Sequence, residues 1–560
     1  MNAPPITADA MSRSPADGAV WTRVADAVFQ SRSALGAMTG VFVLAGLGLV
    51  LGRGALQDEG LLTWVFARWV TIEPLAVVFF QKVKPVPSMI YALPSLGAPE
   101  IMLGVHVLIA ALTAPMLAAV ARALGHRLPN LPAFIVLVSP LFLFGAAAGV
   151  SNVDGVVATT LFLYLAVALR RDSMAGLVLG CIPWVRSELA PFAIVLWLYM
   201  ALVERRRGIA LGTFIFPLLY GMAGAAYHRD LLWLTHFPPA TTFPMPGNPL
   251  WEQLTIDPRD LQVTLLLVTP AVVFALGLRA RRLSPVERVL CLWAALSVLL
   301  LSVLPFLRLG NFSSAARYSL QPLPVFALLA ARAVEPWLEQ VRAPWTVYLL
   351  PTALAAIGWA SGAAPAIVAI PLLGCSVAVA ICGWCGRGRI AACAVGIAAC
   401  LGLAMPRGQL ATPEFVSPAL AWLADHADEV GGATLYTNSP ELAFAIARAP
   451  GLGPDQIRFI VAPDMLWEIG ELSNVANGQR HALQRIARDR LFPPSLPWNE
   501  IGPDTVPRRS LFVLRHDPRL PLLLPETAWA NRRETVGGGE GFTIERVRPA
   551  GDAQAEQVRG

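Results

Sequence analysis

Long apolar runs recur along this chain and constrain its fold more than any other feature. A helix needs about 20 mostly apolar residues to cross a bilayer, because the hydrocarbon core is about 30 Å thick and backbone groups there must hydrogen-bond internally. Such runs extend from Ser33 to about Met405. The chain is 56% hydrophobic and 14% charged, whereas an average soluble domain carries about 25% charged residues. The sequence therefore predicts an all-α polytopic membrane region.

Thirteen runs, bounded by charged residues or by proline and glycine, are predicted to span the bilayer. Two of them, 174–185 and 190–203, are short for complete spans. Arg186 and Glu188 lie between these two, and a single long helix would bury both charges. A helical hairpin that touches the outer face accommodates them better. The predicted spans are 33–52, 101–121, 131–149, 155–169, 174–185, 190–203, 209–227, 261–278, 288–306, 320–334, 345–361, 366–384 and 389–405.

Arginine clusters set the predicted orientation. With a cytoplasmic N-terminus, the clusters at 205–207 and 279–288 fall in inner loops, as the positive-inside rule requires. The net charge of +6 is therefore interpreted as a topology signal, and no nucleic acid is expected as a partner. With a cytoplasmic N-terminus, an odd number of spans places the C-terminus on the extracytoplasmic side of the membrane.

Three regions are predicted on this basis. A cytoplasmic N-terminal tail covers 1–32, and the transmembrane domain covers 33–405, with long outer loops at 53–100 and 228–260. A small soluble α/β domain on the extracytoplasmic side covers 406–560. Within it, the apolar pattern predicts helices at 417–429 and 464–490 and strands at 434–436, 458–461, 510–514 and 542–547.

The first outer loop begins with a pair of acids. Asp58 and Glu59 follow the first span, and an apolar stripe from Leu61 to Trp69 then repeats at three- and four-residue spacing. This spacing predicts an interfacial helix on the membrane surface. Acids at a helix N-terminus are stabilised by the helix dipole, so capping is the simpler interpretation of the pair taken alone.

Other charged residues fall at the outer ends of several spans. Asp154 follows the third span, in a run where Ser151 and Asn152 also suit a helix N-cap. Acids and bases at one lipid–water boundary suit an anionic, lipid-linked substrate. The further residues on this side are Lys82, Lys84, Arg186, Glu188, Arg317 and Tyr318.

The order of these features resembles the GT-C glycosyltransferases, and among them the protein O-mannosyltransferases and the bacterial lipid A aminoarabinose transferases. The longer acidic motif that many members carry after the first span is missing here, as is the long lumenal insertion of the eukaryotic enzymes. The resemblance rests on Asp58 and Glu59 before a juxtamembrane helix, Asp154 after the third span, Trp184-Val-Arg186-Ser-Glu188, Ala316-Arg317-Tyr318 ahead of Gln321-Pro-Leu-Pro324, and Thr434-Leu-Tyr-Thr-Asn-Ser-Pro440.

The resemblance implies a hexosyl- or pentosyltransferase of the bacterial inner membrane. Such an enzyme moves a sugar from a polyprenyl phosphate to a lipid, glycan or protein acceptor outside the membrane. In an inverting displacement, a carboxylate removes the acceptor proton while the phosphate departs from the opposite face of the sugar. Asp58 is the candidate base, Glu59 would orient Asp58 or the acceptor, and Asp154 would hold the acceptor, a metal or a clamp cation.

Positive charge near the departing phosphate is the second requirement of this chemistry, because fixed cations in a partly dehydrated site stabilise developing negative charge. A divalent cation is a candidate cofactor, with Asp58 and Asp154 as candidate ligands. The candidate phosphate ligands are Arg186, Arg317, Lys82 and Lys84, and Glu188 and Tyr318 are candidate contacts to other parts of the substrate.

Three other classes of protein remain open at this point. A transporter or flippase would place ionisable residues near the membrane midplane and often shows internal repeats; no convincing repeat is found, and the charges lie at the ends of spans. A polysaccharide polymerase or ligase usually carries a large outer loop between late spans. A structural membrane protein would not need the charges at the outer face.

Overall fold

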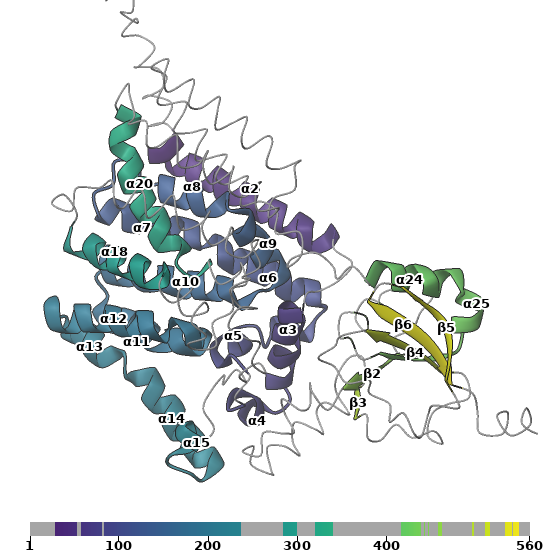
Figure 1. The fold of residues 1–560 in the computed structure, drawn as a ribbon. Helices are drawn as coiled ribbons and strands as arrows, with labels where there is room; N and C mark the ends of the chain where they lie inside the picture. Colours follow the sequence, from purple (N-terminus) through teal and green to yellow (C-terminus); the bar gives the residue numbers. More distant parts are fainter. Residues whose placement is uncertain are drawn as a thin grey trace, which may run out of the picture.

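The computed structural model describes a large helical part and a separate mixed sheet (Figure 1). The described residues are 28–52, 58–80, 83–236, 284–298, 320–339, 416–437, 439, 442, 446, 457–461, 495–497, 510–515, 533–539 and 541–547.

Four helices of the described residues are long and apolar enough to cross a membrane. A fifth candidate combines two helices bent by 56° at a short break. All five coincide with predicted spans. The four are Arg32–Leu51, Pro99–Ala123, Ser151–Ala168 and Arg207–His228, and the bent pair is Leu131–Leu137 with Phe142–Ala148.

The predicted total of thirteen spans stays a prediction. The predicted span 261–278 and the three between 345 and 405 lie outside the described residues. Three predicted spans appear as shorter apolar helices, at Asp172–Val185, Ser187–Val203 and Leu323–Arg332.

The helices of the first part have the following bounds. They are α2 (Arg32–Gly52), α3 (Asp58–Val70), α4 (Pro74–Val78), α5 (Pro85–Ile90), η2 (Pro94–Leu96), α6 (Pro99–Ala111), α7 (Thr113–Ala123), α8 (Leu131–Leu137), α9 (Pro140–Ala148), α10 (Ser151–Leu163), η3 (Tyr164–Ala168), α11 (Asp172–Val185), η4 (Ser187–Leu189), α12 (Ala190–Leu198), η5 (Tyr199–Val203), α13 (Arg207–Gly212), α14 (Ile215–His228), α15 (Trp233–His236), α18 (Pro285–Val298) and α20 (Leu323–Glu339).

Apolar side chains cover the outer faces of α2 and α14. Leu44 is 72% exposed on α2, and Leu219 and Met222 are 62% and 68% exposed on α14. In water, each square ångström of such surface costs about 25 cal/mol relative to burial, whereas lipid tails accept it. Together with the long apolar helices, these faces identify a membrane protein.

The interior is built where α2, α6, α9 and α10 pack together. Phe42 of α2 stacks on Phe142 of α9, with ring centroids 5.4 Å apart. Helix α9 ends at Gly149, whose φ of 70° is the left-handed conformation that glycine adopts without a steric penalty. Val150 is extended, and α10 begins at Ser151. The short link fixes the start of α10 against the end of α9.

Helix α3 occupies the position of the predicted interfacial helix. Trp64 and Trp69 are only 2% and 4% exposed. Trp64 joins the main apolar core, and Trp69 packs with Val77 and Phe80 of the following segment. This aromatic face of the helix therefore contacts protein rather than lipid, because the loop that follows α3 folds back onto it.

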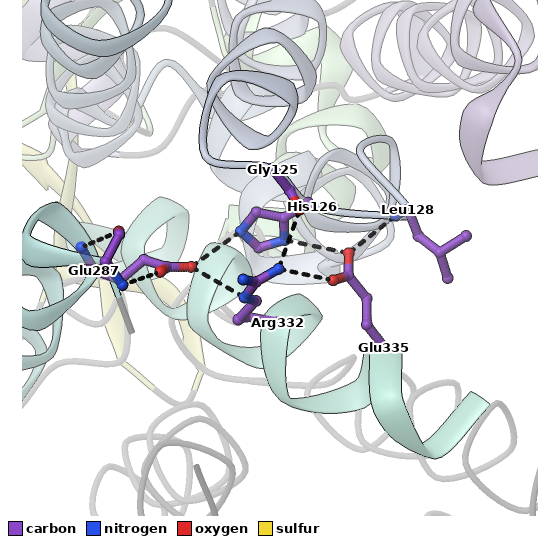
Figure 2. A network of polar contacts seen from close by, with 7 residues as sticks. Gly125, His126, Leu128, Glu287, Arg332 and Glu335 are labelled. Atoms are coloured by element: carbon purple, nitrogen blue, oxygen red, sulfur yellow. Dashed lines mark hydrogen bonds and ion pairs between the residues drawn. The ribbon is translucent and has the colours of Figure 1, made fainter. Parts of the chain in front are cut away.

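Figure 2 shows a charged network around His126, with Glu287, Arg332 and Glu335 close to it. His126 lies between two carboxylates, with Nε2 3.7 Å from Glu287 and Nδ1 3.4 Å from Glu335. Arg332 contacts both carboxylates, at 3.4 and 3.5 Å. Burial raises the pKa of Glu335, but His126 and the Leu128 amide outweigh it and hold the pKa below its usual value. The network joins the α7–α8 loop to α18 and α20.

The sheet has the order β3-β2-β1-β4-β6-β5. Strands β3, β2, β1 and β4 are parallel, and β6 and β5 are antiparallel. Helix α24 (Val416–Asp425), followed by α25 (Ala427–Val430), packs Ala419 and Leu423 against Leu435 and Val513 of the sheet. The strands are β1 (Thr434–Thr437), β2 (Ile457–Val461), β3 (Ser495–Pro497), β4 (Ser510–Arg515), β5 (Arg533–Gly539) and β6 (Phe542–Val547).

All four predicted strands are present, within one residue of their predicted bounds. The sequence missed β3, which is three residues long and contains Pro497, and β5, which ends in three consecutive glycines. The predicted helix 464–490 lies outside the described residues. The predicted limits of the three regions remain untested.

Candidate active site

The candidate site is built at the N-terminus of α10. Ser151 and Asn152 are fully buried in the first helical turn, and Asp154 is 8% exposed. The sequence placed Asp154 in a short loop ahead of a span that begins at 155, but the helix begins four residues earlier, at Ser151. The amide groups and dipole of a helix N-terminus favour negative charge there.

Two cationic side chains converge on the first residue of this helix. Lys84 Nζ donates to Ser151 Oγ at 2.5 Å, and Arg186 Nη1 donates to the same oxygen at 2.7 Å. Arg186 also donates to Asn152 Oδ1 at 3.2 Å. Helix α10 has no side-chain capping hydrogen bond. The N-cap position is occupied by Val150, so Ser151 lies in the first helical turn and not at the N-cap that the simpler interpretation predicted. Its hydroxyl oxygen accepts hydrogen bonds from cations of two distant segments.

Arg186 is held in place by Glu188. The guanidinium donates to both carboxylate oxygens, at 2.8 and 3.2 Å, and is only 3% exposed. The pair occupies a short break between α11 and α12, where Arg186 is extended, as the predicted hairpin requires. Burial raises the pKa of Glu188, but Arg186 and then Lys84 lower it more, so that the pKa lies below its usual value. Glu188 therefore carries a negative charge beside the cations.

Asp154 belongs to a second buried group that the sequence did not indicate. Tyr91 donates from its hydroxyl to Asp154 Oδ1 at 2.5 Å. His106 Nε2 lies 3.5 Å from the same oxygen, and Nδ1 lies 2.7 Å from the Ala146 carbonyl. Burial and then the Asp154 charge raise the pKa of Tyr91 well above its ordinary value, which keeps this hydroxyl protonated as a donor. Only proximity in three dimensions reveals this group, because its members lie on three separate helical segments.

The acid pair lies at the first turn of α3, next to the α9–α10 link. A Cβ on Gly60 would overlap the Ala148 carbonyl oxygen, so the backbones are in direct contact. Asp58 and Glu59 are the two residues before Gly60 and begin α3. Their backbone therefore lies beside the link to α10, but their side chains lie outside the described part of the structure.

The remaining candidates fall outside the described residues. These are Lys82, Arg317 and Tyr318. Leu320 is described, and its Cδ1 would lie 3.3 Å from a Cβ on Gly145 of α9. The chain that follows Tyr318 therefore returns to the helix that precedes α10.

No metal centre is evident among the described residues, where no group of three or more histidine, cysteine, aspartate or glutamate side chains is arranged to hold an ion. A cation held by Asp58 and Asp154 stays a prediction, since one of the two side chains is outside the described set. The described site is organised around cationic side chains, a buried carboxylate and a helix N-terminus.

Comparison with known structures defines the class of fold. A similar structure is that of ArnT from Cupriavidus metallidurans in the apo state, with 12% identity, a TM-score of 0.54, and coverage of 91% of this chain and 97% of ArnT. ArnT bound to undecaprenyl phosphate is also similar, with 11% identity, a TM-score of 0.52 and the same coverage.

The resemblance inferred from the order of the motifs is therefore confirmed for the fold. No protein family model matches the chain, and no curated protein matches it. At 11–12% sequence identity, the similarity to ArnT shows the fold alone.

Proposed function

We propose that this protein is a membrane glycosyltransferase that takes a sugar from a polyprenyl-phosphate donor and passes it to an extracytoplasmic acceptor. The observation that carries the proposal is the convergence of Lys84 and Arg186 on Ser151. Two cations that share one neutral oxygen repel each other. A phosphate beside them, at a helix N-terminus, would be stabilised by both side chains and by the helix.

The fold of the solved neighbours supports this choice of ligand. One ArnT structure holds undecaprenyl phosphate, and this chain has the same overall fold. In the proposed reaction the phosphate of the lipid lies between Lys84 and Arg186. The predicted cations Lys82 and Arg317 would complete the clamp, and Tyr318 and Glu188 would contact the substrate.

The proposed reaction is an inverting displacement. A carboxylate removes the proton from an acceptor hydroxyl, the acceptor oxygen bonds to the anomeric carbon, and the bond from that carbon to the phosphate oxygen breaks. The electron pair of the broken bond stays on the phosphate, next to the cations. Asp58 is proposed as the base and Glu59 as its neighbour that orients it, because their backbone lies beside the link to α10.

The proposal includes an orientation. The cytoplasmic tail is assigned to 1–32, the transmembrane domain to 33–405 and the extracytoplasmic α/β domain to 406–560 of a bacterial inner-membrane protein. In this orientation Lys84, Ser151 and Arg186 all lie at the outer ends of the spans. The network around His126 then lies at the inner ends.

Replacement of Asp58 by asparagine tests the proposed base. In vesicles that contain the full chain and undecaprenyl-phosphate sugars labelled in the sugar, Asp58→Asn should lower transfer to envelope lipids and glycans by at least about 100-fold, the usual contribution of a general base. Expression and thermal stability should stay normal. Glu73→Gln, another acid in the same predicted outer loop, is the matched control and should transfer normally. Full turnover by Asp58→Asn would refute the assignment of the base.

A further inference from the structure

We infer that Tyr91 and His106 are positioning residues that hold Asp154 by one carboxylate oxygen and leave the other oxygen to bind a hydroxyl group of a substrate. The inference rests on the proposed function and assigns a role to Asp154 within it. Tyr91 precedes the second predicted span, and His106 lies inside α6. Neither residue carries a recognisable motif.

The first observation is that both partners contact the same oxygen. Tyr91 donates to Oδ1 of Asp154 at 2.5 Å, and His106 lies 3.5 Å from that oxygen. His106 is itself oriented by the Ala146 carbonyl, which can only accept, so Nδ1 is the donor of that 2.7 Å contact. The imidazole ring is thus fixed with Nε2 facing Asp154, and Nε2 donates to the carboxylate when the ring is protonated. Tyr91 and His106 are 0% and 1% exposed, so neither side chain has room to turn away.

The second observation concerns the other oxygen. Oδ2 of Asp154 is buried and makes no hydrogen bond within the part of the chain that the structure describes. A buried polar atom without a partner costs about 1–3 kcal/mol, and more when it is charged. A protein keeps such an atom where a ligand supplies the missing donor. A substrate hydroxyl is such a donor.

The position of Asp154 indicates which substrate groups can reach it. Ser151 and Asp154 are three residues apart on α10 and therefore lie on the same side of its first turn. The clamp cations contact Ser151, so Oδ2 lies one helical turn from the proposed phosphate. A hydroxyl group of the donor sugar or of the acceptor would have to lie at this position to reach Oδ2. Arg186 donates hydrogen bonds to Ser151, Asn152 and Glu188, and contact between Asp154 and the clamp cations Lys82 or Arg317 stays a prediction, because those two residues lie outside the described part of the chain.

The test compares two tyrosine-to-phenylalanine changes in the full chain. Tyr91→Phe removes the hydroxyl that holds Asp154, whereas Tyr220→Phe removes a buried hydroxyl that donates to the Val78 carbonyl at 2.8 Å. Transfer is measured with labelled undecaprenyl-phosphate sugars at varied donor and acceptor concentrations. Tyr91→Phe should lower kcat/KM by about 10- to 100-fold, as expected when a positioned group is displaced. Tyr220→Phe should stay within about twofold of the natural chain.

A second pair of variants shows whether Tyr91 acts through Asp154. In an Asp154→Ala background, the further change Tyr91→Phe should have less than about a twofold effect, because residues that act as one unit are not additive. If Tyr91→Phe raises only the KM for the donor, the hydroxyl group that Asp154 binds belongs to the donor sugar. If it raises only the KM for the acceptor, that hydroxyl group belongs to the acceptor. Either result supports the inference. If Tyr91→Phe does not fold, His106→Gln carries the same test.

The inference and the proposed function fail in different ways. If the natural chain transfers sugar and Tyr91→Phe behaves like Tyr220→Phe, the inference is overturned and the proposed function stands. Equal losses from Tyr91→Phe in the presence and absence of Asp154 would also overturn it. If the natural chain neither binds undecaprenyl phosphate nor transfers any of the labelled sugars, the proposed function fails and the inference falls with it.

Discussion

Replacement of Arg186 by glutamine should lower transfer from a polyprenyl-phosphate sugar by about 100- to 1000-fold, the usual cost of removing one preorganised group that stabilises developing charge. Arg186 is buried, donates to Ser151 and is fixed by two hydrogen bonds to Glu188. Glutamine keeps a polar side chain but removes the charge next to the departing phosphate. Arg186→Lys should give an intermediate loss, because it keeps the charge and loses the forked geometry.

The glutamine variant also removes the guanidinium that pairs with the half-buried Glu188, which destabilises the fold independently of catalysis. The double variant Arg186→Gln/Glu188→Gln removes that unpaired charge and should still be impaired by at least about 100-fold. A matched control exists between α11 and α13, where Arg206 pairs with Asp172 through two contacts. Arg206→Gln/Asp172→Asn should transfer normally. Equal losses in the two double variants would mean that the effect is structural.

Replacement of Gly60 by alanine should both destabilise the protein and impair transfer. A Cβ at this position would overlap the Ala148 carbonyl oxygen, which belongs to the backbone and cannot turn aside. Overpacking of this kind costs about 1–3 kcal/mol. Displacement of α3 from the α9–α10 link would move Asp58 and Glu59 away from the site, so we expect a lower unfolding temperature and at least a 10-fold loss of transfer.

Gly48→Ala is the control for this prediction. Gly48 lies within α2, and a Cβ there would meet nothing within 4 Å. Alanine favours a helix over glycine by about 1 kcal/mol, so this variant should be as stable as the natural chain or slightly more stable. Unfolding temperature in detergent and transfer in vesicles are the two measurements. Unchanged stability and activity in Gly60→Ala would show that α3 does not depend on this contact.

The spans that the structure describes as long apolar helices were predictable because their signal is local. Predicted span 33–52 became α2 (Arg32–Gly52), and the predicted hairpin break at Arg186 appears between α11 and α12. The need to satisfy every backbone group in lipid makes apolar run length alone informative. A local signal also explains the agreement for β1 and β4, in which apolar residues are bounded by polar ones.

Side-chain partners were less predictable, because they depend on packing between distant segments. The predicted topology places Lys84, Asp154 and Arg186 on one side of the membrane, and the structure brings Lys84 and Arg186 to one oxygen. The identity of that oxygen, Ser151, could not be inferred, since serine before a helix usually caps it. Tyr91 and His106 were missed because a single polar residue in an apolar segment gives no periodic signal.

The failure to predict β5 has a local cause. β5 contains Gly537, where a Cβ would collide with the indole of Trp422, so the glycine is needed for close packing of α24 on the sheet. Glycine has low strand propensity, and the run of glycines was therefore assigned no strand. Pairing with β6 outweighs that propensity.

Protection of Lys84 by undecaprenyl phosphate tests the central claim, that a lipid phosphate binds between Lys84 and Arg186. Lys82 and Lys84 are the two lysines of the sequence, so Lys82→Arg leaves Lys84 as the single lysine. The full chain is treated with an amine-specific reagent in vesicles, and labelling of Lys84 is quantified by mass spectrometry. Undecaprenyl phosphate should reduce labelling at least about fivefold, and uncharged undecaprenol should not, because the phosphate supplies the charge-assisted contacts. Labelling that is unchanged by undecaprenyl phosphate, or equally reduced by undecaprenol, would contradict the claim.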